Sequence, residues 1–212
     1  MQNDDFLIVQ SKKKIKNDIN KEKNEKKKQN KKTTNDNITT TSDKEFPLLR
    51  KWNLGHINGK KMPKQNCSSD VFIKSLNKIG SFDDILTMWS YFNHIDITLL
   101  GLNSCLYVFE DNILPMWEDK NNIGGNIYKS YVSEEHIYSI FMKILLLVVG
   151  EMFGSDGDEE LPSVMSRSVN GIYVKKSFKT YEFQVWTKKN SKNITDVLFD
   201  ITEMEWKCIN IH

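Results

Sequence analysis

The fold is decided by residues 133–150, which read SEEHIYSIFMKILLLVVG. Ser133 is a favourable residue to begin a helix, and Glu134 and Glu135 would lie at the positive end of the helix dipole. Apolar residues recur behind them at helical spacing and form one wide stripe; they are Ile137, Ile140, Phe141, Ile144, Leu145 and Val148. We therefore predict an amphipathic helix that starts at Ser133 and packs this stripe against another layer.

Two further stretches have the same helical period. Residues 81–95 would form a helix begun by Ser81 or Asp84, and residues 190–202 a shorter one. The segments between them are rich in β-branched and aromatic residues, which predicts strands; these are 49–57, 71–79, 104–109, 171–176, 181–187 and 206–211. Short polar links favour antiparallel pairing, so we predict an α+β fold.

The first 44 residues differ in composition from the rest of the 212-residue chain. Residues 1–44 hold 12 lysines and 7 acidic residues with almost no aromatic side chains, so we expect a disordered tail and one domain over 45–212. The tail is either an electrostatic tether for RNA or ribosomes or a solvated extension, and the second interpretation is favoured. Removing its +5 from the overall +2 leaves about −3 on the domain, which argues against a broad basic surface.

Residues 115–119, PMWED, place an indole beside a carboxylate directly after a proline. An electron-rich indole face favours a cationic ring such as 7-methylguanine, and one carboxylate can accept the two adjacent N–H donors of that base. Trp117 would stack and Glu118 would read the base, although a tryptophan is more often a core residue. Asp119 and Glu118 should point opposite ways on an extended segment, which argues against paired acid/base catalysis.

Five segments in order resemble the eukaryotic translation initiation factor 4E family, which binds the 5′ cap of messenger RNA. They are 46–48 with Trp52, 81–95 (SFDDILTMWSYFNHI), 112–125 (NILPMWEDKNNIGG), 145–153 (LLLVVGEMF) and 185–187 (VWT). The resemblance implies one curved antiparallel β-sheet, with three helices on its convex face and a cap slot on its concave face.

The resemblance also implies which side chains form the slot. Trp117 and Phe72 would clamp the base, Glu118 would select it, and Trp186 would lie against its methyl group. The family usually has tryptophan where this chain has Phe72, and phenylalanine attracts a cation less strongly. The alternative for both Phe72 and Trp186 is that each is a strand residue packed in the core.

Phosphate contacts are implied on the strand pair that leads to Trp186. The candidates are Lys175, Lys176 and Lys179, each of which can neutralise phosphate as a point charge but lacks the fork of arginine. Surface solvation is the alternative for each lysine. Glu182 falls near a position where the family has a basic residue.

A second surface is implied for protein partners that carry a helical Tyr-x-x-x-x-Leu-apolar motif, such as an initiation factor 4G-type scaffold. It would be formed by Pro47, Ile85, Trp89, Met142, Leu146 and Gly150. Trp89 would be its main anchor, and packing onto the sheet is the alternative for Trp89 and Ile85. Lys143 stands where an acidic residue is usual.

We therefore expect a non-enzymatic cap-binding protein that recruits messenger RNA through a scaffold. A translational repressor or interaction module of the same fold, with weak cap binding, is the alternative indicated by Phe72 and Lys143. An enzyme is not expected, because the four histidines and three cysteines show no catalytic or metal-ligand spacing. We expect no cofactor, no metal and no membrane span, and a location in the cytoplasm with the nucleus as a second compartment.

Overall fold

The computed structural model describes residues 46–63, 67–151, 168–191 and 194–212. The tail predicted for residues 1–44 lies outside these residues. Within the described part of the chain, no helix is long and apolar enough to cross a membrane.

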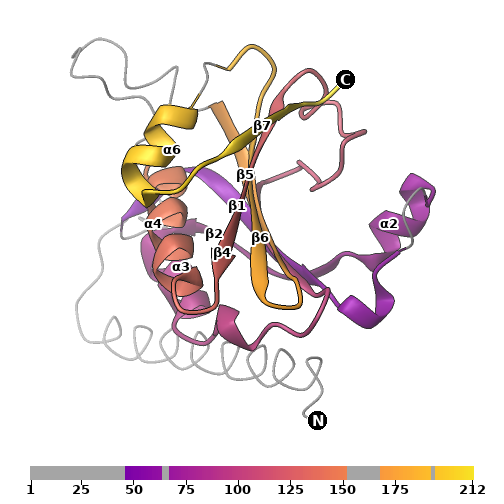
Figure 1. The fold of residues 1–212 in the computed structure, drawn as a ribbon, viewed down its shortest axis with the longest axis horizontal. Helices are drawn as coiled ribbons and strands as arrows, with labels where there is room; N and C mark the ends of the chain where they lie inside the picture. The colour runs from indigo at the N-terminus through magenta and orange to yellow at the C-terminus, as the bar shows by residue number, and fades with distance from the viewer. Residues whose placement is uncertain (1–45, 64–66, 152–167, 192–193) are drawn as a thin grey trace, which may run out of the picture.

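Seven strands form one curved sheet in which every neighbouring pair is antiparallel (Figure 1). Their order is β2-β1-β3-β5-β6-β4-β7. The strands are β1 (Pro47–Ile57), β2 (Asn77–Asp84), β3 (Cys105–Glu110), β4 (Asn126–Ser133), β5 (Val169–Lys176), β6 (Thr180–Thr187) and β7 (Lys207–Asn210). The predicted antiparallel α+β fold is confirmed.

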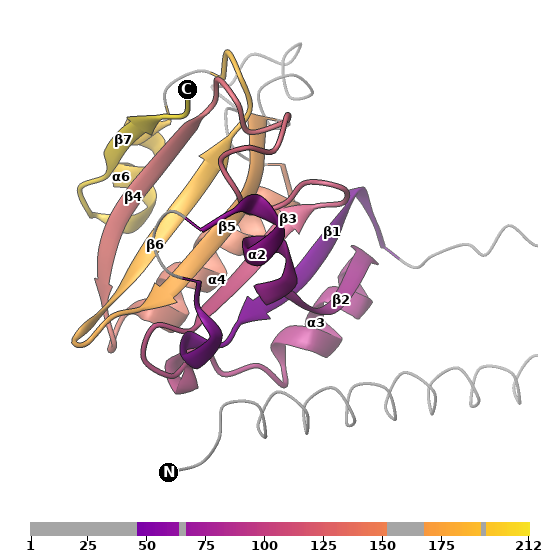
Figure 2. The ribbon, with the colours of Figure 1, turned by 90° about the vertical axis from the view of Figure 1, so that its right-hand side faces the viewer.

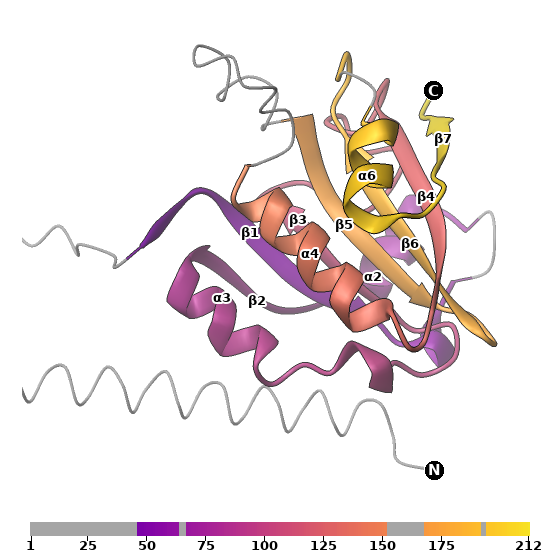
Figure 3. The ribbon, with the colours of Figure 1, turned by 60° about the vertical axis from the view of Figure 1, so that its left-hand side comes forward.

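The described residues contain four α-helices rather than the three expected. They are α2 (Ser69–Ser75), α3 (Ile85–Phe92), α4 (Ile137–Val149) and α6 (Thr195–Thr202), with short 3-10 turns η2 (Gly59–Lys61) and η3 (Ile97–Leu99). Helices α3, α4 and α6 cover the convex face, as Figure 3 shows, whereas α2 stands over the concave face (Figure 2). The additional helix therefore lies on the side where the slot is expected.

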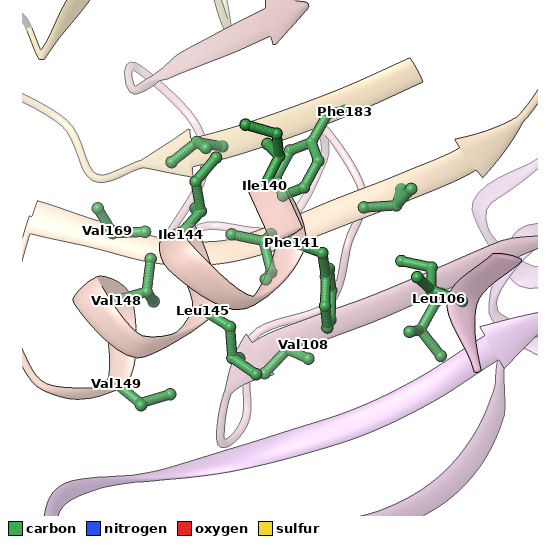
Figure 4. Close-up of a cluster of buried hydrophobic side chains, with 14 of the residues drawn as sticks. Leu106, Val108, Ile140, Phe141, Ile144, Leu145, Val148, Val149, Val169 and Phe183 are labelled. Carbon is green, nitrogen blue, oxygen red and sulfur yellow. The ribbon is translucent and has the colours of Figure 1, made fainter. Parts of the chain in front are cut away.

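The main core lies between α4 and the convex face. Figure 4 shows α4 projecting Phe141, Ile144 and Leu145 toward Val108 and Phe183 of the sheet. These five side chains are at most 2% exposed, and burial of each stabilises the fold by about 1.5–3 kcal/mol. The apolar stripe read from the sequence is thus the contact surface of the helix.

The predicted start of α4 was wrong. Ser133 is the last residue of β4, and the helix begins at Ile137 after a turn. The hydroxyl of Ser133 contacts the Nδ1 of His136 at 2.9 Å instead of capping the helix. Glu134 and Glu135 are exposed in that turn and precede the helix. The Asp84 cap of α3 is confirmed, because its carboxylate accepts from the amide of Thr87 at 2.7 Å.

The strand expected over residues 71–79 was also wrong. Residues 69–75 form α2, and β2 begins only at Asn77. On a helix, Phe72 and Leu76 are four residues apart and share one side, which packs against the buried side chains of the concave face. Val71 and Ile73 are 49% and 41% exposed. The alternation of apolar residues here reflects a short helix with one buried side.

A buried arginine joins three strands and the end of α4. The guanidinium of Arg50 on β1 donates to Glu110 at 2.9 Å, to Glu151 at 2.8 Å and to the carbonyl of Val169 at 2.8 Å. It also lies 4.5 Å from the ring centroid of Trp52. The side chains of Arg50 and Glu151 are only 8% and 5% exposed, so this ion pair is largely desolvated.

The concave face has its own buried layer, in which one close approach depends on a glycine. The phenol of Tyr107 lies directly over Gly55, and a Cβ on that glycine would overlap the tyrosine hydroxyl. Tyr107 is 6% exposed, and burial raises the pKa of its hydroxyl to about 12. The absence of a side chain at Gly55 therefore leaves room for the ring of Tyr107 to cover this part of the concave face.

Candidate functional site

The loop between β3 and β4 carries the predicted base-binding pair. Trp117 is 66% exposed, and Glu118 is exposed beside it. Pro115 and Met116, which precede them, are buried. The loop lies on the same side of the sheet as α2 (Figures 1 and 2). An indole face and a carboxylate are therefore both open to solvent on one anchored loop.

Asp119 turns inward and organises the loop. Residues 117–119 lie in a turn and not in the extended segment expected from the sequence. One carboxylate oxygen accepts from the amide of Leu114 at 2.9 Å. The other accepts from the amide and the side chain of Asn121, at 2.9 and 3.0 Å. These bonds hold the backbone on both sides of Trp117 and Glu118, so the two neighbouring carboxylates have different surroundings.

Two asparagines with fully buried side chains lock the loop to the sheet. The Nδ2 of Asn122 donates to the carbonyls of Leu114 and Met116, both at 2.8 Å. Asn170 on β5 donates from its own Nδ2 to the Oδ1 of Asn122 and to the carbonyl of Asn121, again at 2.8 Å. Both asparagines are 0% exposed. The indole is thus presented by a loop whose conformation is fixed before any ligand arrives.

Neither asparagine was among the site residues predicted from the sequence. One feature of the sequence could have identified Asn170: asparagine is depleted from strands, and this one lies in an otherwise apolar run. A buried amide must find hydrogen-bond partners, and here the partners belong to the loop. A second support comes from the C-terminal end: Gly124 donates to the carbonyl of Ile211, and Ile211 donates to the carbonyl of Gly125, each at 2.9 Å.

Trp186 lies in the floor of the concave face. It is 3% exposed, and its ring packs edge-on against Phe109 with centroids 5.7 Å apart. Its Nε1 donates to the Oε1 of Gln184 at 2.8 Å. Phe72, on α2, packs partly buried against the same layer. Both predicted aromatic side chains are therefore on the concave side, but Trp117 is the one that is largely open to solvent.

The three predicted lysines do not share one face. Lys175 pairs across the sheet with Glu182 and follows Tyr173 of the concave layer by two residues, so it projects from the concave face. Lys179 is exposed in the turn between β5 and β6. Lys176 points to the convex face, where its Nζ lies 2.7 Å from Glu134 and 4.0 Å from the ring centroid of Tyr181. Its position gives no support to a phosphate contact.

The predicted partner surface lies on the convex side. Helices α3 and α4 are neighbours, because the rings of Phe92 and Phe141 are 5.6 Å apart. Their outer sides carry Ile85 (38% exposed), Leu146 (42% exposed) and the half-buried Trp89 and Met142. Pro47 is exposed and pairs with Asp84 at the start of α3, while Gly150 is exposed at the end of α4. The six predicted positions thus belong to one side of the molecule.

The described residues thus form a small α+β domain, with helices on the convex side of an antiparallel sheet and a β3–β4 loop that presents an indole and a carboxylate to solvent. Comparison with known proteins places it more closely. The family model described as eukaryotic initiation factor 4E matches residues 47–208, and the chain belongs to this family. Proteins of this family are cap-binding factors and not enzymes.

Similar sequences and structures agree with this assignment. The chain is 28% identical over 130 residues to zebrafish (Danio rerio) initiation factor 4E-1A, a match that covers 59% of this chain and 57% of that protein. It is 27% identical to zebrafish factor 4E-1B, over 77% of this chain and 71% of that protein. A solved complex of Caenorhabditis elegans eIF4E-3 with the 4E-binding protein Mextli and cap analog is similar in fold, with a TM-score of 0.62 and 23% identity, over 76% of this chain and 91% of that one.

Proposed function

We propose that this protein binds the 7-methylguanosine cap of messenger RNA and delivers the transcript to the initiation machinery through a scaffold protein. The observation that carries the proposal is the solvent-open pair Trp117 and Glu118 on a loop held by buried hydrogen bonds. The indole face can stack on the cationic base, and the carboxylate can accept from two adjacent N–H groups. Membership of the 4E family supports the same ligand.

Phe72 and Trp186 would complete the base site. Phe72 is placed on a short helix over the concave face, from which its ring would face the base across from Trp117. Trp186 would contribute the wall beneath the methyl group. The concave-side lysines Lys175 and Lys179 would meet the phosphates, whereas Lys176 is turned away.

The convex surface around Trp89 would receive the partner. A helix with a Tyr-x-x-x-x-Leu-apolar motif could lay its apolar stripe across α3 and α4, against Trp89, Met142 and Leu146. Lys143 is exposed in this surface and would favour a partner with an acidic residue at the facing position.

A second candidate function is that of a repressor or interaction module with weak cap binding. Three features favour it: the chain has phenylalanine at position 72, Trp186 is 3% exposed, and Glu182 lies beside Lys175 on the concave face, where its charge would repel phosphate. In this case the partner surface would be used without tight attachment to the transcript.

Tryptophan fluorescence titrated with 7-methyl-GTP separates the two functions, with GTP as the unmethylated control. We expect strong quenching in the wild type, loss of binding in Trp117→Ala, and tighter binding in Phe72→Trp. Trp89→Phe serves as the matched control, because it removes an indole from the opposite face. An unquenched wild type would contradict cap binding and favour the interaction module.

A further inference from the structure

A hollow of about 430 Å³ lies at the β4–β7 edge of the sheet, outside the site described above. It is lined by Lys129, Ser130, Tyr131, Glu205, Trp206, Lys207 and Ile209. Ile127 belongs to the buried concave layer, and side chains two residues apart on a strand share a face. Lys129 and Tyr131 therefore project from the concave face. Lys207 pairs with Lys129 across the strands and shares that face.

Two of the residues that line the hollow are lysines, Lys129 and Lys207. Lys207 is exposed and makes no ion pair with any residue that the structure describes. Lys129 is held 2.9 Å from Glu182, which positions its ammonium and leaves further N–H donors. Since these two lysines are cross-strand neighbours, their ammonium groups can address one phosphate together.

Tyr131 and Ile209 add aromatic and apolar surface to the lining of the hollow. Tyr131 is 59% exposed, and Ile209 is 37% exposed. The Nζ of Lys129 lies 5.3 Å from the centroid of the Tyr131 ring, which steadies the ring by a cation–π contact. An exposed aromatic ring beside lysines is the combination that single-stranded nucleic acid binds, by stacking and by charge. The exposed Glu205 can accept a hydrogen bond from a ribose hydroxyl.

An RNA chain that leaves the proposed cap slot would pass this hollow. On β4, Ile127 pairs with Trp186 and Lys129 pairs with Gln184. Lys129 therefore lies two residues along β4 from the position that faces Trp186. Two residues along a strand span about 6.8 Å, which is within reach of the nucleotide that succeeds a bound cap. We propose that this hollow binds that nucleotide, its phosphate on Lys129 and Lys207 and its base on Tyr131. The proposal rests on the proposed cap-binding function.

The test compares three ligands: 7-methyl-GTP, a capped RNA of five nucleotides, and the same RNA with an uncapped 5′ triphosphate. We expect the wild type to bind the capped RNA more tightly than 7-methyl-GTP. Tyr131→Ala and Lys207→Glu should each weaken capped RNA by about fivefold or more and leave 7-methyl-GTP unchanged. Lys207→Ala should reduce the salt slope for capped RNA by about 0.7.

Two matched variants control for stacking and for net charge. Tyr131→Phe keeps the ring and should bind capped RNA like the wild type, and Lys143→Glu makes the same charge change on the convex face. Equal binding of capped RNA by wild type and both hollow variants would overturn the proposal, as would an equal loss in Lys143→Glu. If 7-methyl-GTP does not bind at all, the cap proposal fails separately. The uncapped RNA then decides, because a hollow that binds nucleotides must still lose affinity in Lys207→Glu.

Discussion

Asn170 on β5 donates a 2.8 Å hydrogen bond to the side-chain oxygen of Asn122, and through it the sheet fixes the loop that presents Trp117. The bond joins positions 48 residues apart in sequence. Asn122 uses the same amide group to hold the carbonyls of Leu114 and Met116. The direction of the indole thus depends on a residue that no ligand would touch.

Replacing either asparagine should therefore weaken cap binding from a distance. Asn170→Ala removes the donor to the buried Oδ1 of Asn122 and to the partly buried carbonyl of Asn121. The loss should cost about 1–3 kcal/mol of folding free energy and free the loop. We expect a lower urea midpoint and weaker binding of 7-methyl-GTP. Asn93→Ala, at an exposed position beyond α3, is the control. Unchanged affinity in Asn170→Ala would show that the loop needs no lock.

The adjacent carboxylates should respond in opposite ways to neutralisation. Glu118→Gln keeps the shape and removes the charge of an exposed group, so stability should stay constant while 7-methyl-GTP affinity falls at least about tenfold. Asp119→Asn weakens three hydrogen bonds inside the loop and should lower the melting temperature. Paired melting curves and titrations of the two variants check this, and identical profiles would contradict the division of tasks.

Arg50 should be among the most sensitive positions for stability. Arg50→Met removes a cation that Glu110 and Glu151 share at a largely desolvated position, and breaking such a buried ion pair usually costs about 3–5 kcal/mol. Urea unfolding measures the change. The double variant Arg50→Met/Glu151→Gln should recover part of the loss, because it also removes the buried charge of Glu151. No recovery would show that the contact with Trp52, and not the ion pair, carries the effect.

The partner surface should be separable from the slot. Trp89→Ala should weaken a helical Tyr-x-x-x-x-Leu-apolar peptide by about 2 kcal/mol or more and leave 7-methyl-GTP binding unchanged. Leu146→Glu, on the neighbouring helix, should do the same by placing a charge in the apolar stripe. Calorimetry with the peptide and with the nucleotide measures both. Full peptide affinity in Trp89→Ala would place the docking site elsewhere.

Only two of the three thiols should react in the native protein. Cys208 is exposed and Cys67 is half-buried, whereas Cys105 is buried. Burial raises the pKa of Cys105 to about 12, more than the hydrogen bond from the hydroxyl of Tyr173 and the charge of Lys175 lower it. Its thiolate is therefore scarce at pH 8, and alkylation followed by mass spectrometry should label it only after denaturation. Early labelling of Cys105 would contradict the buried position.

The parts of the fold that could be predicted from the sequence are those set by a local pattern of residues. The stripe of α4 and the Asp84 cap of α3 are local patterns, and both were found. Strand β4 was missed because it has no clean alternation: Ser130 is polar yet buried, and its hydroxyl donates to the carbonyl of Glu205. The start of α4 was misplaced for the same reason, since Ser133 is used by that strand.

The candidate site shows the same division between local and tertiary information. Trp117 and Glu118 could be singled out from their neighbours in the chain, and the structure leaves both open to solvent. The face on which Lys176 lies depends on the pairing register of β5 and β6, which the sequence left undetermined. Asn170 acts through a contact that exists only after folding, so no local pattern specified its role.

The close fit of Tyr107 over Gly55 ties two neighbouring strands together in a way that reaches beyond stability. A bulkier residue at position 55 could be accepted only together with a smaller one at position 107. Related sequences should therefore change positions 55 and 107 together. The shape of the concave face at this point would then change through paired substitutions and not through single ones.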